Sequence, residues 1–171
     1  MAISKRNIAI ITLFACLLSY SASYATPPSD EEMNLALASA ETLFKAMRAK
    51  QYPEIWQGLT GKTKISILNA VFRELKKAGT ELTREKIASD FESGGAVSRA
   101  YWDGYLLVFN PELVLEQSRW TLGPLRKDRA EINILYRKSD KPATLQLFKE
   151  SNQWKVGLNE TFGTRNIVPF F

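Results

Sequence analysis

The side chain with the clearest potential for chemistry is Asp103, which stands among aromatic residues. Tyr101, Trp102 and Tyr105 flank it in the sequence. A carboxylate in an apolar pocket holds its proton more tightly and can act as a general base that removes a proton from carbon. The alternative is structural, because Arg99 stands four residues before Asp103, a spacing that lets the two pair on one helical face. We favour the ion pair and predict no catalytic residue.

Several kinds of site are excluded by composition. The 171-residue chain contains no histidine, and its one cysteine is Cys16, near the N-terminus. Histidine is the commonest general base and metal ligand, so its absence removes the usual route to both kinds of site. One cysteine in a leader leaves no disulfide framework and no thiol nucleophile for the folded domain. We therefore predict no metal and no cofactor.

The charge of the chain is mildly positive. Its formal net charge is +5, and Lys5 and Arg6 lie in the leader, which leaves 21 basic and 18 acidic residues. The basic residues alternate with acidic ones and form no stripe of lysine and arginine alone. Nucleic-acid binding, which depends on such a stripe, is therefore not expected.

A binding pocket is the second possible use of the aromatic residues. An apolar cavity between helices and sheet could hold a lipid-like or aromatic ligand, with Arg119 supplying a charge at its mouth. The other interpretation is that the same aromatic side chains fill the core. The candidate pocket comprises Trp56, Tyr101, Trp102, Asp103, Tyr105, Arg119 and Trp120.

The first 25 residues have the pattern of a secretory signal peptide. Lys5-Arg6 is a basic start, residues 8–18 are apolar, and Ser23-Tyr24-Ala25 provides the small residues of a cleavage site after Ala25. Two alternatives remain: Leu13-Phe14-Ala15-Cys16 resembles a bacterial lipobox, in which Cys16 would carry a lipid anchor, or the leader stays uncleaved. Residues 26–30 follow as a linker and 31–171 as one domain.

The first two-thirds of this domain predict helices. Ser29 and Glu32 have the spacing of a capping box, and apolar residues from Met33 to Met47 recur every three or four positions, as on a helix with one buried face. Further helices are expected at 53–59, 63–78, 84–91, 96–109 and 112–116. Ser93-Gly94-Gly95 lacks the lysine and the glycine spacing of a phosphate-binding loop, and we interpret it as a plain connection.

The last third predicts an antiparallel sheet of about four strands. Apolar and polar residues alternate within 130–137, 143–150 and 153–159, which is typical of strands with one buried face. Residues 118–122 are expected to form a further strand before a break at Gly123-Pro124. Ser151-Asn152 has the length of a tight hairpin. Phe148 is out of phase with Leu145 and Leu147 and should point to the outer face.

The pattern as a whole resembles the nuclear-transport-factor-2-like (NTF2-like, cystatin-like) superfamily. The resemblance covers about residues 31–162 and is carried by Tyr52-Pro53-Glu54-Ile55-Trp56 and by the closing hairpin with Trp154-Lys155-Val156. It implies an α+β fold in which N-terminal helices pack on a curved antiparallel sheet as a cone. Members include isomerases, dehydratases, ligand carriers and modules that only dimerise or dock, so the fold leaves function open.

We expect an exported, non-enzymatic binding or interaction module of the bacterial envelope. Its partner would be a second copy of the chain or an envelope protein, bound through Phe148 and the apolar residues 168–171. The alternatives are a carrier of a small apolar or lipid-like ligand in the cone pocket and, less favoured, a ketosteroid-isomerase-like enzyme that uses Asp103.

Overall fold

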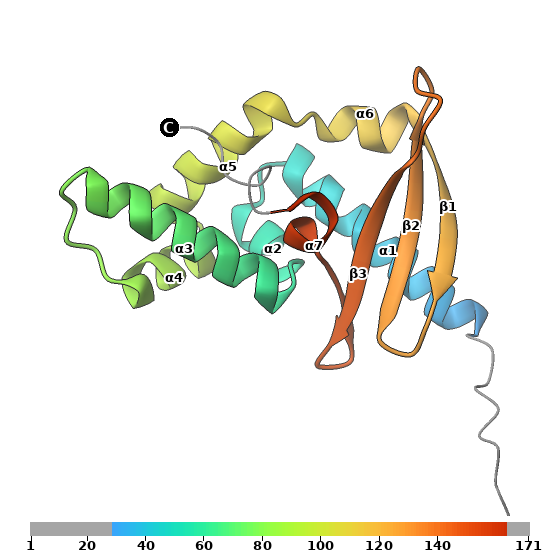
Figure 1. Cartoon of the computed structure of the whole chain (residues 1–171), viewed down its shortest axis with the longest axis horizontal. Helices are drawn as coiled ribbons and strands as arrows, with labels where there is room; N and C mark the ends of the chain where they lie inside the picture. Colours follow the sequence, from blue (N-terminus) through green and yellow to red (C-terminus); the bar gives the residue numbers. More distant parts are fainter. Residues whose placement is uncertain (1–28, 164–171) are drawn as a thin grey trace, which may run out of the picture.

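The computed structural model describes residues 29–163, and the chain has the expected α+β architecture (Figure 1). The predicted leader, Cys16 and the apolar residues 168–171 lie outside the described residues. Within residues 29–163, no helix is long and apolar enough to cross a membrane. The elements are α1 (Asp30–Arg48), α2 (Tyr52–Gln57), α3 (Gly61–Lys77), α4 (Arg84–Ser93), α5 (Ala96–Val108), α6 (Pro111–Glu116), β1 (Ser118–Leu125), β2 (Arg129–Tyr136), β3 (Ala143–Glu150), β4 (Gln153–Val156) and α7 (Leu158–Phe162).

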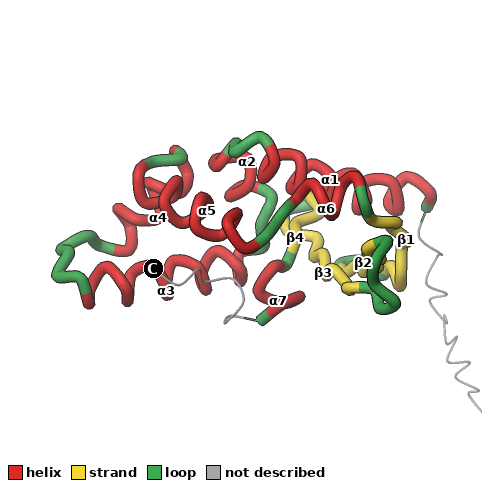
Figure 2. Tube along the Cα trace, turned by 90° about the horizontal axis from the view of Figure 1, so that it is seen from above, coloured by secondary structure: helices red, strands yellow, loops and turns green. Residues whose placement is uncertain are grey.

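Helix α1 is the element that covers the sheet. Ser29 Oγ accepts a hydrogen bond from the backbone N–H of Glu32 at 3.2 Å, as the predicted capping box requires. The Glu32 side chain does not complete the box, because it bonds to Lys149 and Trp154 of the sheet instead. Ala40, Phe44 and Met47 of the predicted stripe are buried. Figures 1 and 2 show α1 crossing the sheet, with α2 to α5 gathered beside the sheet.

The sheet has the strand order β1-β2-β3-β4, with antiparallel pairing throughout. Ser151 and Asn152 both have positive φ, 47° and 62°, which is the backbone of the tight hairpin that their positions predicted. Alternation places Ala130, Ile132, Leu145 and Leu147, each at most 1% exposed, on the face that α1 covers. Phe148 points to the outer face, as expected, where the Arg129 guanidinium lies over its ring.

The last predicted strand is too long, and a short helix takes its place. β4 ends at Val156, and α7 follows at Leu158–Phe162. At this point Val156 pairs with Leu59 in a parallel bridge: Val156 N donates to Gly58 O at 2.8 Å, and Thr60 N donates to Val156 O at 3.1 Å. These bonds close the edge of the sheet, so the chain leaves it at Gly157. Alternation along the sequence cannot detect this contact with the end of α2.

The first strand is longer than predicted. It continues through Gly123-Pro124 to Leu125, where a break was expected. The pairing register shifts between Leu122 and Leu125, so the two residues form a bulge in the edge strand. A proline is tolerated at such a place because no ladder hydrogen bond is required of it.

The loop between α4 and α5 is the plain connection that the sequence predicted. Gly94 ends α4 with a φ of 68°, the left-handed conformation that glycine adopts most readily. The Asp90 carboxylate then accepts a hydrogen bond from Ser98 N at 2.7 Å, which satisfies a free donor of the first turn of α5. A side chain of this protein thus occupies the position where a phosphate-binding loop would hold its ligand.

This contact makes Gly95 a testable position. A Cβ at Gly95, whose φ is −71°, would overlap the Asp90 carboxylate. We expect Gly95→Ala to lower the free energy of unfolding by about 1–2 kcal/mol, the usual range for a lost helix cap. Urea unfolding of a double-mutant cycle checks the cause, because in an Asp90→Ala background the second substitution should cost almost nothing. An equal loss of unfolding free energy in both backgrounds would show that the contact with Asp90 is not the cause.

Candidate functional site

Eight aromatic side chains form a continuous row through the interior, here called the aromatic row. Neighbouring ring centroids lie 4.7 to 5.8 Å apart, most of them edge-to-face or tilted, which is the favourable arrangement for aromatic pairs. The row connects the helical layer to the inner face of β1. In order it comprises Trp56, Phe91, Tyr101, Trp102, Tyr105, Phe109, Phe44 and Trp120.

Four residues of the predicted pocket are therefore packed against aromatic neighbours. Trp56, Tyr101, Trp102 and Tyr105 are each at most 4% exposed. Burial raises the pKa of both tyrosine hydroxyls well above the ordinary value, which keeps them neutral. Two buried side-chain atoms of α5, Ser98 Oγ and Trp102 Nε1, have no hydrogen-bond partner within residues 29–163. These aromatic rings fill the interior space in which the sequence suggested a ligand pocket.

Asp103 lies on the surface of α5, away from the aromatic row. Its carboxylate accepts hydrogen bonds from Lys50 Nζ at 2.8 Å and from the Tyr52 hydroxyl at 2.9 Å. The Lys50 hydrogen bond is the main reason that the pKa of Asp103 lies below its usual value, and the Tyr52 hydrogen bond adds to it. A general base that works near neutral pH needs the opposite shift. This environment favours a structural ion pair.

The cation of that ion pair differs from the one predicted. Arg99 was expected to pair with Asp103, but its Nε donates to the Gly94 carbonyl at 2.8 Å. Lys50 follows the C-terminal end of α1 with a φ of 54° and extends to α5. The prediction used only neighbours along one helix, so it could not weigh a cation that arrives from another element.

The two remaining pocket candidates lie on opposite faces of β1. Trp120 faces inward against Phe44, and its Nε1 donates to Val114 O at 2.9 Å. Arg119 faces outward and is exposed. The structure thus brings five of the seven predicted residues into the aromatic row and places Asp103 and Arg119 elsewhere.

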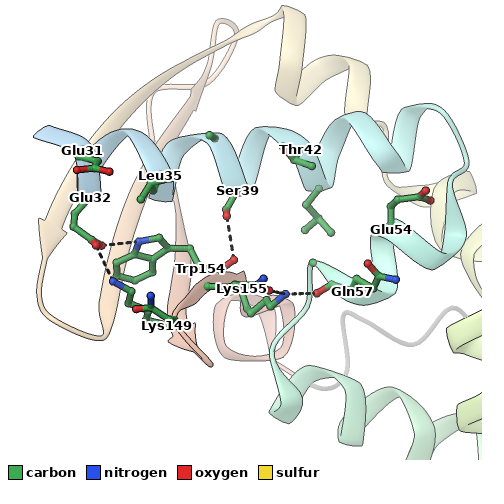
Figure 3. Close-up of a pocket in the computed structure, with 15 residues that line it drawn as sticks. Glu31, Glu32, Leu35, Ser39, Thr42, Glu54, Gln57, Lys149, Trp154 and Lys155 are labelled. Atoms are coloured by element: carbon green, nitrogen blue, oxygen red, sulfur yellow. Dashed lines mark hydrogen bonds and ion pairs between the residues drawn. The ribbon is translucent and has the colours of Figure 1, made fainter.

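A surface groove runs between α1 and the β3–β4 hairpin and has a volume of about 590 Å³ (Figure 3). We call it the α1–β4 groove. Apolar, acidic and basic side chains from three segments line it. They include Glu31, Leu35, Ala38, Ser39 and Thr42 of α1, Glu54 and Gln57 of α2, and Lys149, Trp154 and Lys155 of the sheet.

A cluster of three side chains closes one end of the groove. Lys149 Nζ lies 2.8 Å from Glu32 Oε1, and Trp154 Nε1 donates to Glu32 Oε2 at 3.1 Å. Lys149 also lies over the Trp154 ring, 5.7 Å from its centroid. The Lys149 hydrogen bond is the largest cause that holds the pKa of Glu32 below its usual value. Figure 3 shows these groups beneath the first turns of α1, which they fix to the sheet.

The rest of the groove has free acidic groups and small side chains. Within residues 29–163, Glu31 and Glu54 form no ion pair, whereas Lys155 Nζ donates to Gln57 O at 2.9 Å and to Gln153 Oε1 at 2.8 Å. No group of three or more histidine, cysteine, aspartate or glutamate residues in the described part of the chain could hold a metal ion. The groove is suited to binding by contact and charge.

Sequence reasoning missed this groove because its walls come from distant segments. Two signals were present: Leu35 lies outside the apolar stripe of α1 and is 49% exposed, and Lys149 occupies an inward-facing position of β3. A cation on the inner face of a sheet requires a partner, so Lys149 is the stronger of the two signals, whereas a single exposed leucine is common on protein surfaces.

Comparison with known proteins adds no relative: no protein-family model, no curated protein and no solved structure matches this chain. The resemblance to the NTF2-like superfamily stays a prediction. Function must be argued from the residues themselves.

The Glu32 cluster predicts a pH dependence of stability. Because the folded pKa of Glu32 is depressed, its contribution is present above the unfolded pKa and is lost as the pH falls through the folded value. We expect Glu32→Gln to lower the urea midpoint of unfolding at pH 7, and this difference from wild type to shrink as the pH falls below the unfolded pKa of glutamate, about 4.3. Glu31→Gln removes a neighbouring carboxylate without an ion pair and should change little. A difference that persists at low pH would rule out the ionic origin.

Proposed function

We propose that this protein is an exported, non-enzymatic interaction module of the bacterial envelope, and that it holds a segment of a partner protein in the α1–β4 groove. One observation carries the proposal: the interior is filled by the aromatic row, while a groove of about 590 Å³ lies open along α1. A partner segment therefore has more space in this surface groove than in the interior of the domain.

The lining of the groove indicates the chemistry of the partner segment. Ala38, Ser39 and Thr42 are small, so α1 leaves space beside it, and Leu35 offers an apolar contact. The carboxylates of Glu31 and Glu54 lie at the two ends, and neither pairs with a cation of the described part of the chain. A segment with an apolar side chain between basic ones would match both features.

The partner would be held by side chains more than by strand pairing. The edge of β4 that faces away from β3 is already hydrogen-bonded. Ser39 Oγ donates to Trp154 O at 3.1 Å, and Val156 N donates to Gly58 O at 2.8 Å. Addition of a further strand needs an edge whose backbone groups are unpaired. Specificity for the partner segment would therefore come from side-chain contacts with the walls of the groove.

The two alternative functions have less support. A ketosteroid-isomerase-like reaction would need a base in an apolar site, and Asp103 is an exposed carboxylate with two hydrogen-bond donors. A carrier of a small apolar ligand would need an internal cavity beside Trp102, and its ring packs against Tyr101 and Tyr105 at 4.9 and 5.6 Å between centroids.

Photocrosslinking in the producing cells tests the groove. A benzophenone amino acid at Ala38, within the groove, should capture a specific partner, and a doubly charge-reversed variant, Glu31→Lys with Glu54→Lys, should reduce the product several-fold because it repels a basic segment. A product of twice the chain mass would identify a second copy as the partner, and any other mass an envelope protein.

The control position is Ile65 on α3, which is 61% exposed and lies outside the groove. The same label at Ile65 should give no such product. Equal capture at both positions, or none at Ala38, would contradict a binding role for the groove.

Export is testable by the mass of the N-terminus. The basic start at Lys5-Arg6, the apolar residues 8–18 and the small residues before Thr26 support removal of residues 1–25. We expect intact-mass spectrometry of protein from the producing cells to show a chain that begins at Thr26. A lipidated chain beginning at Cys16 would support the anchored alternative, and a full-length cytoplasmic chain would exclude export.

A further inference from the structure

Two arginines that form no ion pair within residues 29–163 lie side by side on the outer face of the sheet. Arg119 of β1 pairs with Leu135 of β2, and the backbone N–H of Arg137 donates to Gln117 O at 2.9 Å one pair further along. Residues two apart on a strand share a face, so Arg119 and Arg137 are diagonal neighbours on the outer face. Such neighbours lie about 7–8 Å apart, within reach of two long side chains.

Both arginines line one cavity of about 400 Å³, at the end of the sheet near the β2–β3 turn. Its two serine hydroxyls are already in use, because Ser118 Oγ donates to Leu113 O at 2.8 Å and Ser139 Oγ donates to Lys141 O at 3.0 Å. The guanidinium groups supply the charged N–H donors of the lining. Neither arginine side chain has a hydrogen bond or an ion pair within residues 29–163.

The charge of this cavity is positive. Among the described residues its one acidic lining residue is Glu116, whose carboxylate lies 2.9 Å from Arg48 Nη1 of α1, a cation that it shares with Glu112 at 3.5 Å. Two guanidinium groups therefore face one partly compensated carboxylate. Two other arginines of the described chain are engaged: Arg99 donates to Gly94 O, and Arg129 lies over the Phe148 ring. Arg119 and Arg137 differ from these in sharing one hollow, where they outnumber its single carboxylate.

We propose that Arg119 and Arg137 form a binding site for a phosphate dianion, as in inorganic phosphate or a phosphate monoester. Each guanidinium presents a planar fork of N–H donors that matches two oxyanion oxygens. The two together carry two positive charges, which a phosphate of about −1.5 to −2 neutralises and a single carboxylate does not. This site lies on the face of the sheet opposite α1, so it is independent of the function proposed for the groove.

Titration calorimetry of the purified protein with inorganic phosphate at low ionic strength tests the site. We expect one phosphate per chain, and about a tenfold weaker affinity for Arg119→Gln or Arg137→Gln, the effect of losing one charge-assisted contact. Arg126→Gln is the matched control: it removes the same charge from the turn after β1, at the other end of the strand, and should change the affinity little. Affinity should also fall as the pH drops through about 6, where phosphate takes up a proton.

A second arm separates two sources of the same chemistry. Vesicles that contain phosphatidic acid, a lipid phosphate monoester, are compared with vesicles of phosphatidylcholine alone. Cosedimentation with the former, lost in Arg119→Gln, would identify a lipid headgroup as the ligand, whereas binding of free phosphate alone would identify a soluble one. Loss of affinity in Arg126→Gln equal to that in Arg119→Gln, or no binding in either arm, would overturn the proposal.

Discussion

The junction between β4 and the segment from Gly58 to Thr63 is the constraint on which the rest of the fold depends. Val156 exchanges backbone hydrogen bonds with Gly58 and Thr60, and the fully buried Thr60 donates its hydroxyl to Glu160 of α7 at 2.9 Å. Buried polar groups must be paired, so these bonds tolerate few alternative arrangements. They fix the positions of α2, α3 and α7 relative to one another and to β4.

The position of the groove follows from this junction. Helix α1 must cover the inner face of the sheet and also pack on α2, so it bridges the two layers, and the hollow beneath it is the α1–β4 groove. The same arrangement brings α5 inward, where Tyr101, Trp102 and Tyr105 occupy the interior. A filled interior and an open groove are thus two results of one packing solution.

Local patterns in the sequence predicted the elements well, because burial on one face leaves a period in the chain. The stripe of α1, the hairpin at Ser151-Asn152 and the outward Phe148 were all found in this way. The errors arose where a tertiary contact overrides the local pattern. Lys50 took the place of Arg99 beside Asp103, and the bridge to Leu59 ended β4 before the period did. The groove was missed for the same reason, since no single segment contains it.

The two faces of the sheet end up with different chemistry because only one of them is covered. On the covered face, Lys149 is neutralised by Glu32, as a partly buried charge must be. On the outer face, solvent makes unpaired charge inexpensive, so Arg119 and Arg137 need no internal acid to be tolerated. These two guanidinium groups therefore stay available for the phosphate that we propose as their ligand. Because α1 and the sheet separate that hollow from the groove, the partner proposed for the groove and the anion proposed for the outer face would not exclude each other.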